Sequence, residues 1–116
     1  MKDLKFKAFY KGNLHDVLSI DFNRYKVNIL LNDNIITLDF LEVKLLQYTG
    51  IKDKTGKEIY NNFIVKIKKK YYKIIYVSNY CGFVAVSHKP KVRPITTDCE
   101  VVGCIWDNNK KLLELI

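Results

Sequence analysis

The sequence predicts a mainly β fold: a small barrel or sandwich of about seven short antiparallel strands, with a short helix allowed at the C-terminal end. Apolar residues recur mostly with a period of two, which is typical of strands with one buried face. Turn-forming residues separate these runs at intervals of about 8–12 residues. The chain has 116 residues, of which 48% are hydrophobic, enough for one compact core. We therefore expect a single domain over residues 1–116.

The first half of the chain has the pattern of an antiparallel meander. Alternating runs predict strands at residues 5–10, 17–22, 25–31 and 35–40. Within the second and third runs the alternation predicts shared faces: Leu18, Ile20 and Phe22 in one, and Tyr25, Val27, Ile29 and Leu31 in the other. Turns are expected at residues 11–13, at Asn23-Arg24 and at residues 32–34. Residues 38–47 fit both a short helix and a strand, and we favour extended structure with a break near Phe40-Leu41.

The second half begins with a loop at residues 49–57, in which Asp53 to Gly56 predicts a tight turn. Beyond the loop, alternation predicts strands at residues 63–68, 72–77, 83–86 and 100–106. The first two of these strands are expected to pair antiparallel around a reversal at Lys69-Lys70. Residues 87–97 contain both prolines and are expected to form a loop. Asp107-Asn108-Asn109 can cap a short helix that extends through Leu115.

Cysteine spacing argues against a metal site. The chain has three cysteines, Cys81, Cys99 and Cys104, and His88 is the histidine nearest to them. These spacings differ from the tight Cys-x2–4-Cys knuckles of zinc sites, and an extended 99–104 segment would point its two thiols to opposite faces. We expect free, partly buried thiols, no metal and no cofactor.

The sequence also lacks the known catalytic motifs with which we compared it. Neither His15 nor His88 has a nucleophile signature beside it. The stretch from Gly50 to Glu58 has a superficial likeness to a phosphate-binding loop, but its glycines are one residue too far apart and Glu58 replaces the hydroxyl that would bind magnesium. We therefore expect that the protein is not an enzyme, contains no stoichiometric zinc and hydrolyses no nucleoside triphosphate.

Positive charge is concentrated in the middle of the chain. The net charge is +8, and residues 51–94 carry 11 basic but only 2 acidic side chains. Such a field attracts anions, including nucleic acid, nucleotides and acidic protein surfaces. The alternative is a lysine-rich face that only keeps the protein soluble.

The predicted binding surface is the basic hairpin, which we define as residues 66–73. Its lysines and tyrosines are Lys66, Lys68, Lys69, Lys70, Tyr71, Tyr72 and Lys73, with Tyr76 and Tyr80 following. Lysines interleaved with tyrosines are typical of grooves that bind single strands, although strand tyrosines also pack against cross-strand neighbours. Lys66 and Lys68 are expected to share a strand face. Lys52, Lys54 and Lys57 extend the surface if the preceding loop folds alongside.

The segment from Leu46 to Tyr60, Leu-Gln-Tyr-Thr-Gly-Ile-Lys-Asp-Lys-Thr-Gly-Lys-Glu-Ile-Tyr, closely resembles the central signature of YopX-type proteins of phages and prophages. Residues 5–9 and 100–108 are similar to the N-terminal and C-terminal elements of that family. The chain departs from the family pattern at two places, where Asn61-Asn62-Phe63 replaces Glu-Gly-Asp and Asn109-Lys110 replaces Pro-Glu.

The resemblance implies a small β-rich fold and a phage or prophage origin, and it implies no particular chemistry. Within the signature, paired residues are expected to shape the loop: Gly50 and Gly56 by their backbone freedom, Ile51 and Ile59 by anchoring its ends, and Tyr48 and Tyr60 by packing across its neck. We therefore favour a structural role over a binding role for this segment.

Three classes of function remain open. The favoured class is a non-enzymatic accessory inhibitor or sequestering factor, anti-CRISPR-like, that acts on a host nucleic-acid-handling or defence component through the basic surface. The second is a module that binds single-stranded nucleic acid directly, and the third is a structural or assembly protein whose strands self-associate.

The partner expected for the favoured class is a host protein or ribonucleoprotein, or an anionic ligand such as RNA, DNA or a nucleotide. No membrane partner is expected, and a homo-oligomer is allowed. Residues 1–5 lack the apolar region of a signal peptide, so the expected location is the cytoplasm of the bacterial host.

Overall fold

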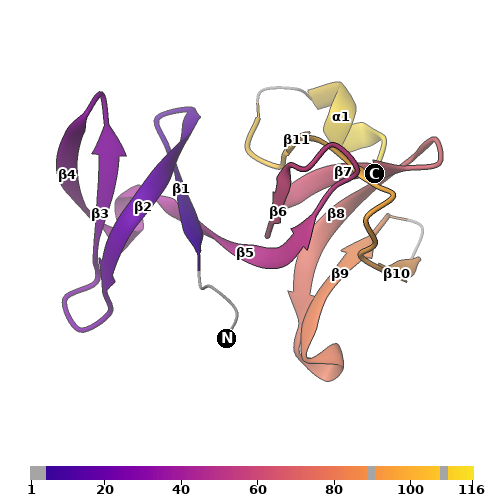
Figure 1. Cartoon of the computed structure of the whole chain (residues 1–116), viewed down its shortest axis with the longest axis horizontal. Helices are drawn as coiled ribbons and strands as arrows, with labels where there is room; N and C mark the ends of the chain where they lie inside the picture. Colours follow the sequence, from indigo (N-terminus) through magenta and orange to yellow (C-terminus); the bar gives the residue numbers. More distant parts are fainter. Residues whose placement is uncertain (1–4, 89–90, 108–109) are drawn as a thin grey trace. The chain divides into compact units, whose positions relative to one another are not determined.

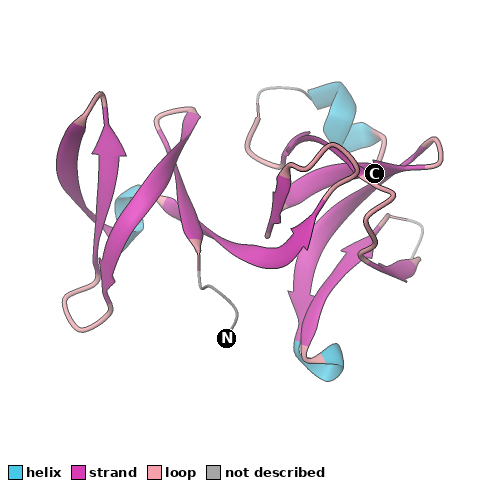
Figure 2. Cartoon of the chain, viewed as in Figure 1, coloured by secondary structure: helices cyan, strands magenta, loops and turns pink. Residues whose placement is uncertain are grey.

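The computed structural model describes residues 5–88, 91–107 and 110–116, and most of these residues lie in strands (Figures 1 and 2). Contacts divide the described chain into two compact units, one ending at Gln47 and the other beginning at Tyr48. Strand β5 (Lys44–Lys52) runs through this boundary. A single domain over residues 1–116 remains a prediction.

The first unit is an antiparallel meander. Its other elements are β1 (Phe6–Tyr10), β2 (Asn13–Asp21), β3 (Lys26–Leu31), β4 (Asn34–Asp39) and the 3-10 helix η1 (Phe40–Glu42). Strand β5 pairs with β1 through residues 44–47, which gives the strand order β4-β3-β2-β1-β5. The apolar faces of these strands enclose a small core formed by Ala8, Val27, Ile29, Leu38 and Val43.

A bulge in β2 makes the predicted face of the second strand wrong. The register between β2 and β3 shifts between Val17 and Ser19, so the alternation of side chains breaks at Leu18. Leu18 is therefore exposed, whereas Ile20 packs against the core. Phe22 lies beyond the end of the strand and is also exposed.

The predicted face of the third strand is correct in its centre and wrong at its start. Val27 and Ile29 are buried, as the alternation predicts. Tyr25 instead lies in the β2–β3 turn with a φ of 57° and is exposed. The Asp21 carboxylate stabilises this turn, because it accepts hydrogen bonds from the backbone N–H groups of Asn23 and Arg24 at 3.0 and 3.1 Å.

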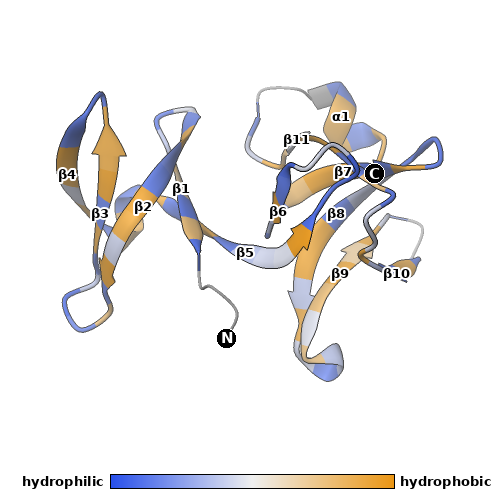
Figure 3. Cartoon of the chain, in the orientation of Figure 1, coloured by the Kyte–Doolittle hydropathy of each residue, from blue (hydrophilic) through white to orange (hydrophobic). Residues whose placement is uncertain are grey.

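The second unit contains a five-stranded antiparallel sheet with the order β10-β9-β8-β7-β11. The elements of this unit are β6 (Glu58–Tyr60), β7 (Phe63–Ile67), β8 (Lys70–Val77), the 3-10 helix η2 (Ser78–Tyr80), β9 (Gly82–Val86), β10 (Val92–Pro94), β11 (Glu100–Cys104) and α1 (Lys110–Glu114). The second half of β5 pairs with β6. Strand β7 is the centre of the core, with four of its five residues buried (Figure 3).

Helix α1 approaches the sheet at Gly103. A Cβ atom at this position would lie 2.9 Å from the Leu112 side chain and 2.7 Å from the Asp107 carboxylate. The Asp107 carboxylate accepts the backbone N–H of Cys104 at 2.9 Å. Asp107 therefore stabilises the end of β11, and the two other predicted cap residues, Asn108 and Asn109, lie outside the described residues.

The prediction of a mainly β, antiparallel fold is confirmed, and so is the pairing of the two runs around the basic hairpin, where Val65 lies opposite Tyr72. The described residues contain eleven strands rather than about seven, and both sheets are open rather than closed into a barrel. Strands β6 and β10 have three residues each, which is too short for a period to be recognised.

Three local predictions need correction. Pairing of β5 continues to Lys52, so part of the predicted loop at residues 49–57 is strand. Residues 38–47 contain both alternatives, η1 followed by β5, because the Asp39–Glu42 capping box favours a helical turn. The proline-containing loop includes β10, an edge strand that ends at Pro94, where a missing N–H is tolerated.

Candidate anion-binding site

The signature loop is organised by the Asp53 carboxylate, which is 5% exposed. Its Oδ1 atom accepts three hydrogen bonds, from the Thr55 N–H (2.9 Å), the Thr55 hydroxyl (2.7 Å) and the Lys57 N–H (2.9 Å). Its Oδ2 atom accepts the Val101 N–H of β11 at 2.8 Å. The carboxylate therefore shapes the tight turn and joins it to a strand 48 residues later in the chain.

The other signature residues also fit a structural role. Gly50 and Gly56 have φ values of 87° and 88°, a region that favours glycine. The rings of Tyr48 and Tyr60 lie 5.4 Å apart across the neck of the loop. Ile59 is fully buried. The expectation that this segment shapes the fold is therefore met at these positions.

Hydrogen bonding to the ionised form lowers the pKa of the Asp53 carboxyl group. Burial opposes its ionisation, but the donors from Val101, Thr55 and Lys57 outweigh burial and lower its pKa from 3.8 to about 2. The unfolded chain therefore binds this proton at higher pH than the folded chain does. Its contribution to stability is complete above about pH 4 and is lost as the pH falls through about 2.

This pKa shift predicts a pH-dependent gap between the wild type and Asp53→Asn. A shift of this size corresponds to about 2 kcal/mol of unfolding free energy. We expect the wild type to lose about that much more stability than the variant between pH 5 and pH 2. Urea denaturation of both proteins across this range measures the gap, and parallel pH profiles would contradict the assignment.

The basic hairpin reverses direction in a two-residue β-turn between β7 and β8. Lys68 and Lys69 occupy the turn with φ values of 51° and 77°, and Ile67 pairs with Lys70. The reversal thus lies one residue earlier than predicted, and Lys68 does not share a strand face with Lys66. Figure 3 shows the turn as hydrophilic, β7 as mostly hydrophobic and β8 as mixed.

The remaining hairpin residues lie on both faces of the strand pair. Lys66 is exposed and lies opposite Tyr71, with its Nζ atom 5.8 Å from the centre of that ring. Lys73 is half-buried. Tyr72 is 2% exposed and belongs to the core, so it cannot offer a ring face to a partner.

Acidic side chains from outside the hairpin lie close to its lysines. Glu100 of β11 lies opposite Lys66. The Asp98 carboxylate accepts the Thr96 hydroxyl, which lowers the pKa of Asp98, and the positive charges of Arg93 and Lys68 lower it further. Residues 66–73 contain no acidic side chain. Glu100 of β11 and Asp98, which precedes that strand, therefore offset part of the positive charge of the hairpin.

The signature loop lies along β11, so Lys54 extends the basic surface. The Lys54 Nζ atom is 3.5 Å from the Glu100 carboxylate, which places Lys54 and Lys66 on either side of that acid. Lys52 lies opposite Glu58 in the β5–β6 pair. Lys57 is exposed, and its backbone N–H is used by Asp53.

The exposed tyrosines are separated from the hairpin turn. Tyr76 and Tyr80 are 56% and 62% exposed, but they lie at and beyond the far end of β8. Six residues of strand, about 20 Å, separate Tyr76 from Lys70. The predicted mixture of exposed aromatic rings and lysines therefore does not form one continuous stacking surface.

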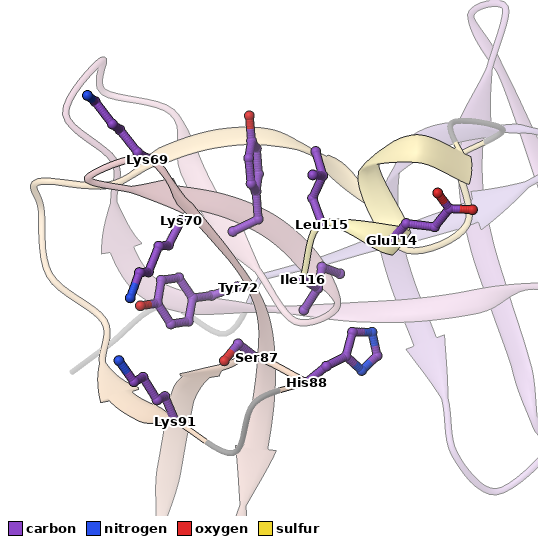
Figure 4. A pocket seen from close by; sticks show the side chains of 10 residues that line it. Lys69, Lys70, Tyr72, Ser87, His88, Lys91, Glu114, Leu115 and Ile116 are labelled. Carbon is purple, nitrogen blue, oxygen red and sulfur yellow. The ribbon is translucent and has the colours of Figure 1, made fainter.

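A groove of about 460 Å³ opens beside the hairpin (Figure 4). Hairpin residues Lys69 to Tyr72 line it together with Lys91, His88 and the segment from Glu114 to Ile116. The sequence reasoning missed Lys91 and the C-terminal segment, because nothing in their local pattern places them beside residues 69–72. The one available signal was the high lysine density of residues 51–94.

Two of the three cysteines, Cys99 and Cys104, are buried thiols with raised pKa values, whereas Cys81 is exposed. Cys99 and Cys104 are both buried, because the bulge between Val101 and Gly103 shifts the alternation that predicted opposite faces. Burial raises the pKa of Cys99, and burial with the Asp107 carboxylate raises that of Cys104 to about 11. Across the described residues, no three His, Cys, Asp or Glu side chains gather as metal ligands would.

The family model of the YopX protein matches residues 3–114 of the chain. The chain belongs to the YopX family. The match covers the signature loop held by Asp53, the basic hairpin and most of the residues that line the groove. The resemblance inferred from residues 5–9, 46–60 and 100–108 is therefore confirmed.

The YopX match identifies the family without assigning a ligand or a partner. No curated protein matches the chain by sequence. In the part of this YopX protein that the structure describes, no helix is long and apolar enough to cross a membrane.

Proposed function

We propose that this YopX protein is a non-enzymatic binding protein that is encoded by a phage or prophage. It binds an anionic component of the host through the basic hairpin. The role that fits best is that of an inhibitor or sequestering factor acting on nucleic-acid-handling or defence machinery. The cytoplasm of the bacterial host is the location that this role requires.

One observation carries the proposal: the β7–β8 turn has lysines where folding favours other residues. Both Lys68 and Lys69 have positive φ values, and two-residue turns of this kind prefer Asn-Gly or Asp-Gly. The β3–β4 turn of the same chain instead uses Asn32 and Asp33, at φ values of 50° and 65°, and both residue types tolerate positive φ. Residues held in unfavourable backbone regions cluster at active sites, ligand clamps and switch regions.

The charge around the turn supports the same conclusion. Lys69 and Lys70 lie next to Lys68, and like charges at such short range oppose folding. Glu100 and Asp98 offset part of this charge, but they lie toward Lys66 and Lys68. The net positive charge of the turn would attract an anionic partner.

Direct binding of an extended single strand has less support. Such binding uses exposed aromatic rings next to a basic groove. Tyr72 is buried and Tyr76 lies about 20 Å along the strand from Lys70, so the hairpin offers charge without a row of stacking rings.

The double variant Lys68→Asn/Lys69→Gly tests the proposal, because it improves the turn and removes two charges. We expect the unfolding free energy to rise by about 1 kcal/mol, while capture of partners from a lysate of the bacterial host falls. Pull-downs with and without nuclease treatment measure the capture and show whether nucleic acid mediates it.

The matched control is Lys11→Asn/Lys44→Gln, which removes two exposed lysines of the first unit. Lys11 also has a positive φ, of 49°, so the control repeats both the loss of charge and the change at a strained turn. Capture should be unchanged in this control. If the Lys68/Lys69 variant is more stable and still captures the same partners in full, the hairpin lysines are only a soluble face.

A further inference from the structure

The groove exists because β8 is longer than its neighbour. The pairing of β8 with β9 ends where Lys73 lies opposite Val86, yet β8 itself begins at Lys70. Beyond β9, the Ser87 N–H donates to the Lys91 carbonyl at 3.2 Å. The first residues of β8 therefore line a hollow together with Ser87 and Lys91, instead of pairing with β9.

The C-terminal segment closes the other side of the hollow. The His88 N–H donates to the Ile116 carbonyl at 3.3 Å, and the Leu115 N–H donates to the Leu112 carbonyl at 3.2 Å. Leu112 is buried and packs beside Gly103. Helix α1 thereby holds Leu115 and Ile116 as an apolar wall of the groove.

The groove has a cationic end and an opposite end that bears a carboxylate. Figure 4 shows Lys70 and Lys91 extending toward the hydroxyl end of Tyr72 on one side, Lys69 pointing away from these two lysines, and Glu114 on the other side. Glu114 is the one acidic side chain among the described residues that line the groove. A ligand that fits both ends carries an anionic group at one end and a hydrogen-bond donor at the other.

We propose that this groove is a nucleotide-binding site, an inference that rests on the proposed function and names the ligand of its basic surface. Lys70 and Lys91, which converge beside the Tyr72 hydroxyl, would hold the phosphate by charge-assisted hydrogen bonds. Tyr71 and Leu115 offer apolar surface to the base, and Glu114 can accept a hydrogen bond from a ribose hydroxyl or a base amine.

The dimensions of the groove favour a ligand of this size. Its volume of about 460 Å³ falls within the range of about 300–1,000 Å³ that small-molecule sites occupy. Aromatic and aliphatic walls with a few convergent polar groups are also typical of such sites. The terminal nucleotide of a strand presents the same chemistry as a free nucleotide, so the test separates these two sources.

Titration calorimetry with AMP, GMP, adenosine and the 5′-phosphorylated dinucleotide pApA tests the site. We expect saturable binding of one AMP or GMP per chain, and binding of adenosine at least about tenfold weaker, because adenosine lacks the phosphate. Tighter binding of pApA than of AMP assigns the site to a strand end, and equal or weaker binding assigns it to free nucleotides.

Lys91→Glu locates the binding, since Lys91 lines the groove but is not part of the basic hairpin. We expect Lys91→Glu to weaken AMP binding at least about tenfold. Lys44→Glu makes the same change in net charge at an exposed lysine of the first unit that does not line the groove, and it should leave AMP binding within about twofold. Equal losses in both variants would reduce the effect to general electrostatics and overturn the site.

The two proposals fail in different ways. If none of the four probes binds, or if AMP and adenosine bind equally, the groove is not a nucleotide site, and the proposed function stands as long as Lys68→Asn/Lys69→Gly still reduces partner capture. If AMP binds as described while that double variant captures every partner in full, the nucleotide site stands and the proposed function of the hairpin is wrong.

Discussion

Asp53→Ala should destabilise the second unit by about 3–4 kcal/mol, the largest effect on stability that we expect from one substitution. The change removes a carboxylate that is 5% exposed and accepts four hydrogen bonds. A hydrogen bond to a charged group contributes about 1.5–3 kcal/mol, and its donor pays a desolvation cost when the partner is lost. Water can replace Asp53 at Thr55 and Lys57, which are exposed, so the full sum is not expected.

Denaturation in urea, followed by the fluorescence of Trp106, measures this loss. Trp106 is the single tryptophan of the chain and lies two residues beyond β11, the strand that Asp53 joins to the signature loop. Asp53→Asn should fall between Asp53→Ala and the wild type, because it keeps one acceptor oxygen and loses the charge.

Asp98→Ala is the matched control for Asp53→Ala. Asp98 is an aspartate of the same unit, but it is exposed. Its carboxylate accepts a hydrogen bond from the Thr96 hydroxyl. We expect no comparable loss in this control. An Asp53→Ala protein that unfolds at the same urea concentration as the wild type would show that the carboxylate does not hold the loop on β11.

Replacing Lys68, Lys69 and Lys70 together by glutamate should abolish partner capture and leave the fold intact. The change reverses three charges at the projecting turn, so an anionic partner that was attracted is now repelled. The three side chains are exposed, and exposed hairpin tips tolerate substitution. Circular dichroism and the Trp106 signal check the fold, and pull-down from host lysate measures the capture.

Salt dependence separates the classes of partner in this experiment. If the partner is nucleic acid, each lost phosphate contact should reduce the slope of log affinity against log salt by about 0.7–0.9. A protein partner should show a smaller dependence on salt and capture that survives nuclease treatment.

A triple charge reversal elsewhere controls for net charge. Lys5, Lys11 and Lys44 are exposed lysines of the first unit, and their replacement by glutamate changes the net charge by the same amount. Capture should persist in this control variant. If the hairpin variant folds and works as well as the wild type, the basic hairpin is a solubilising surface and the proposed function is wrong.

Features that depend only on neighbouring residues were predictable from the sequence. Period-two alternation predicted β7 and β8, because successive side chains of a strand point to opposite faces whatever lies around them. The lysines of the turn and the glycines of the signature were also visible in the sequence, since a tight turn is set by the few residues that form it. The signature itself was specific enough to indicate the family.

Contacts between distant segments became visible only in the folded chain. Nothing local to Asp53 indicates that its carboxylate accepts the N–H of Val101, 48 residues away. Lys91 and Leu115 likewise join Lys69 only because β8 extends past β9 and α1 returns over Gly103. Strand register also depends on bulges, and one extra residue reverses every face beyond it. For this reason the alternation failed at Leu18 and again between Cys99 and Cys104, while the hairpin, which has a regular register, was predicted correctly to within one residue.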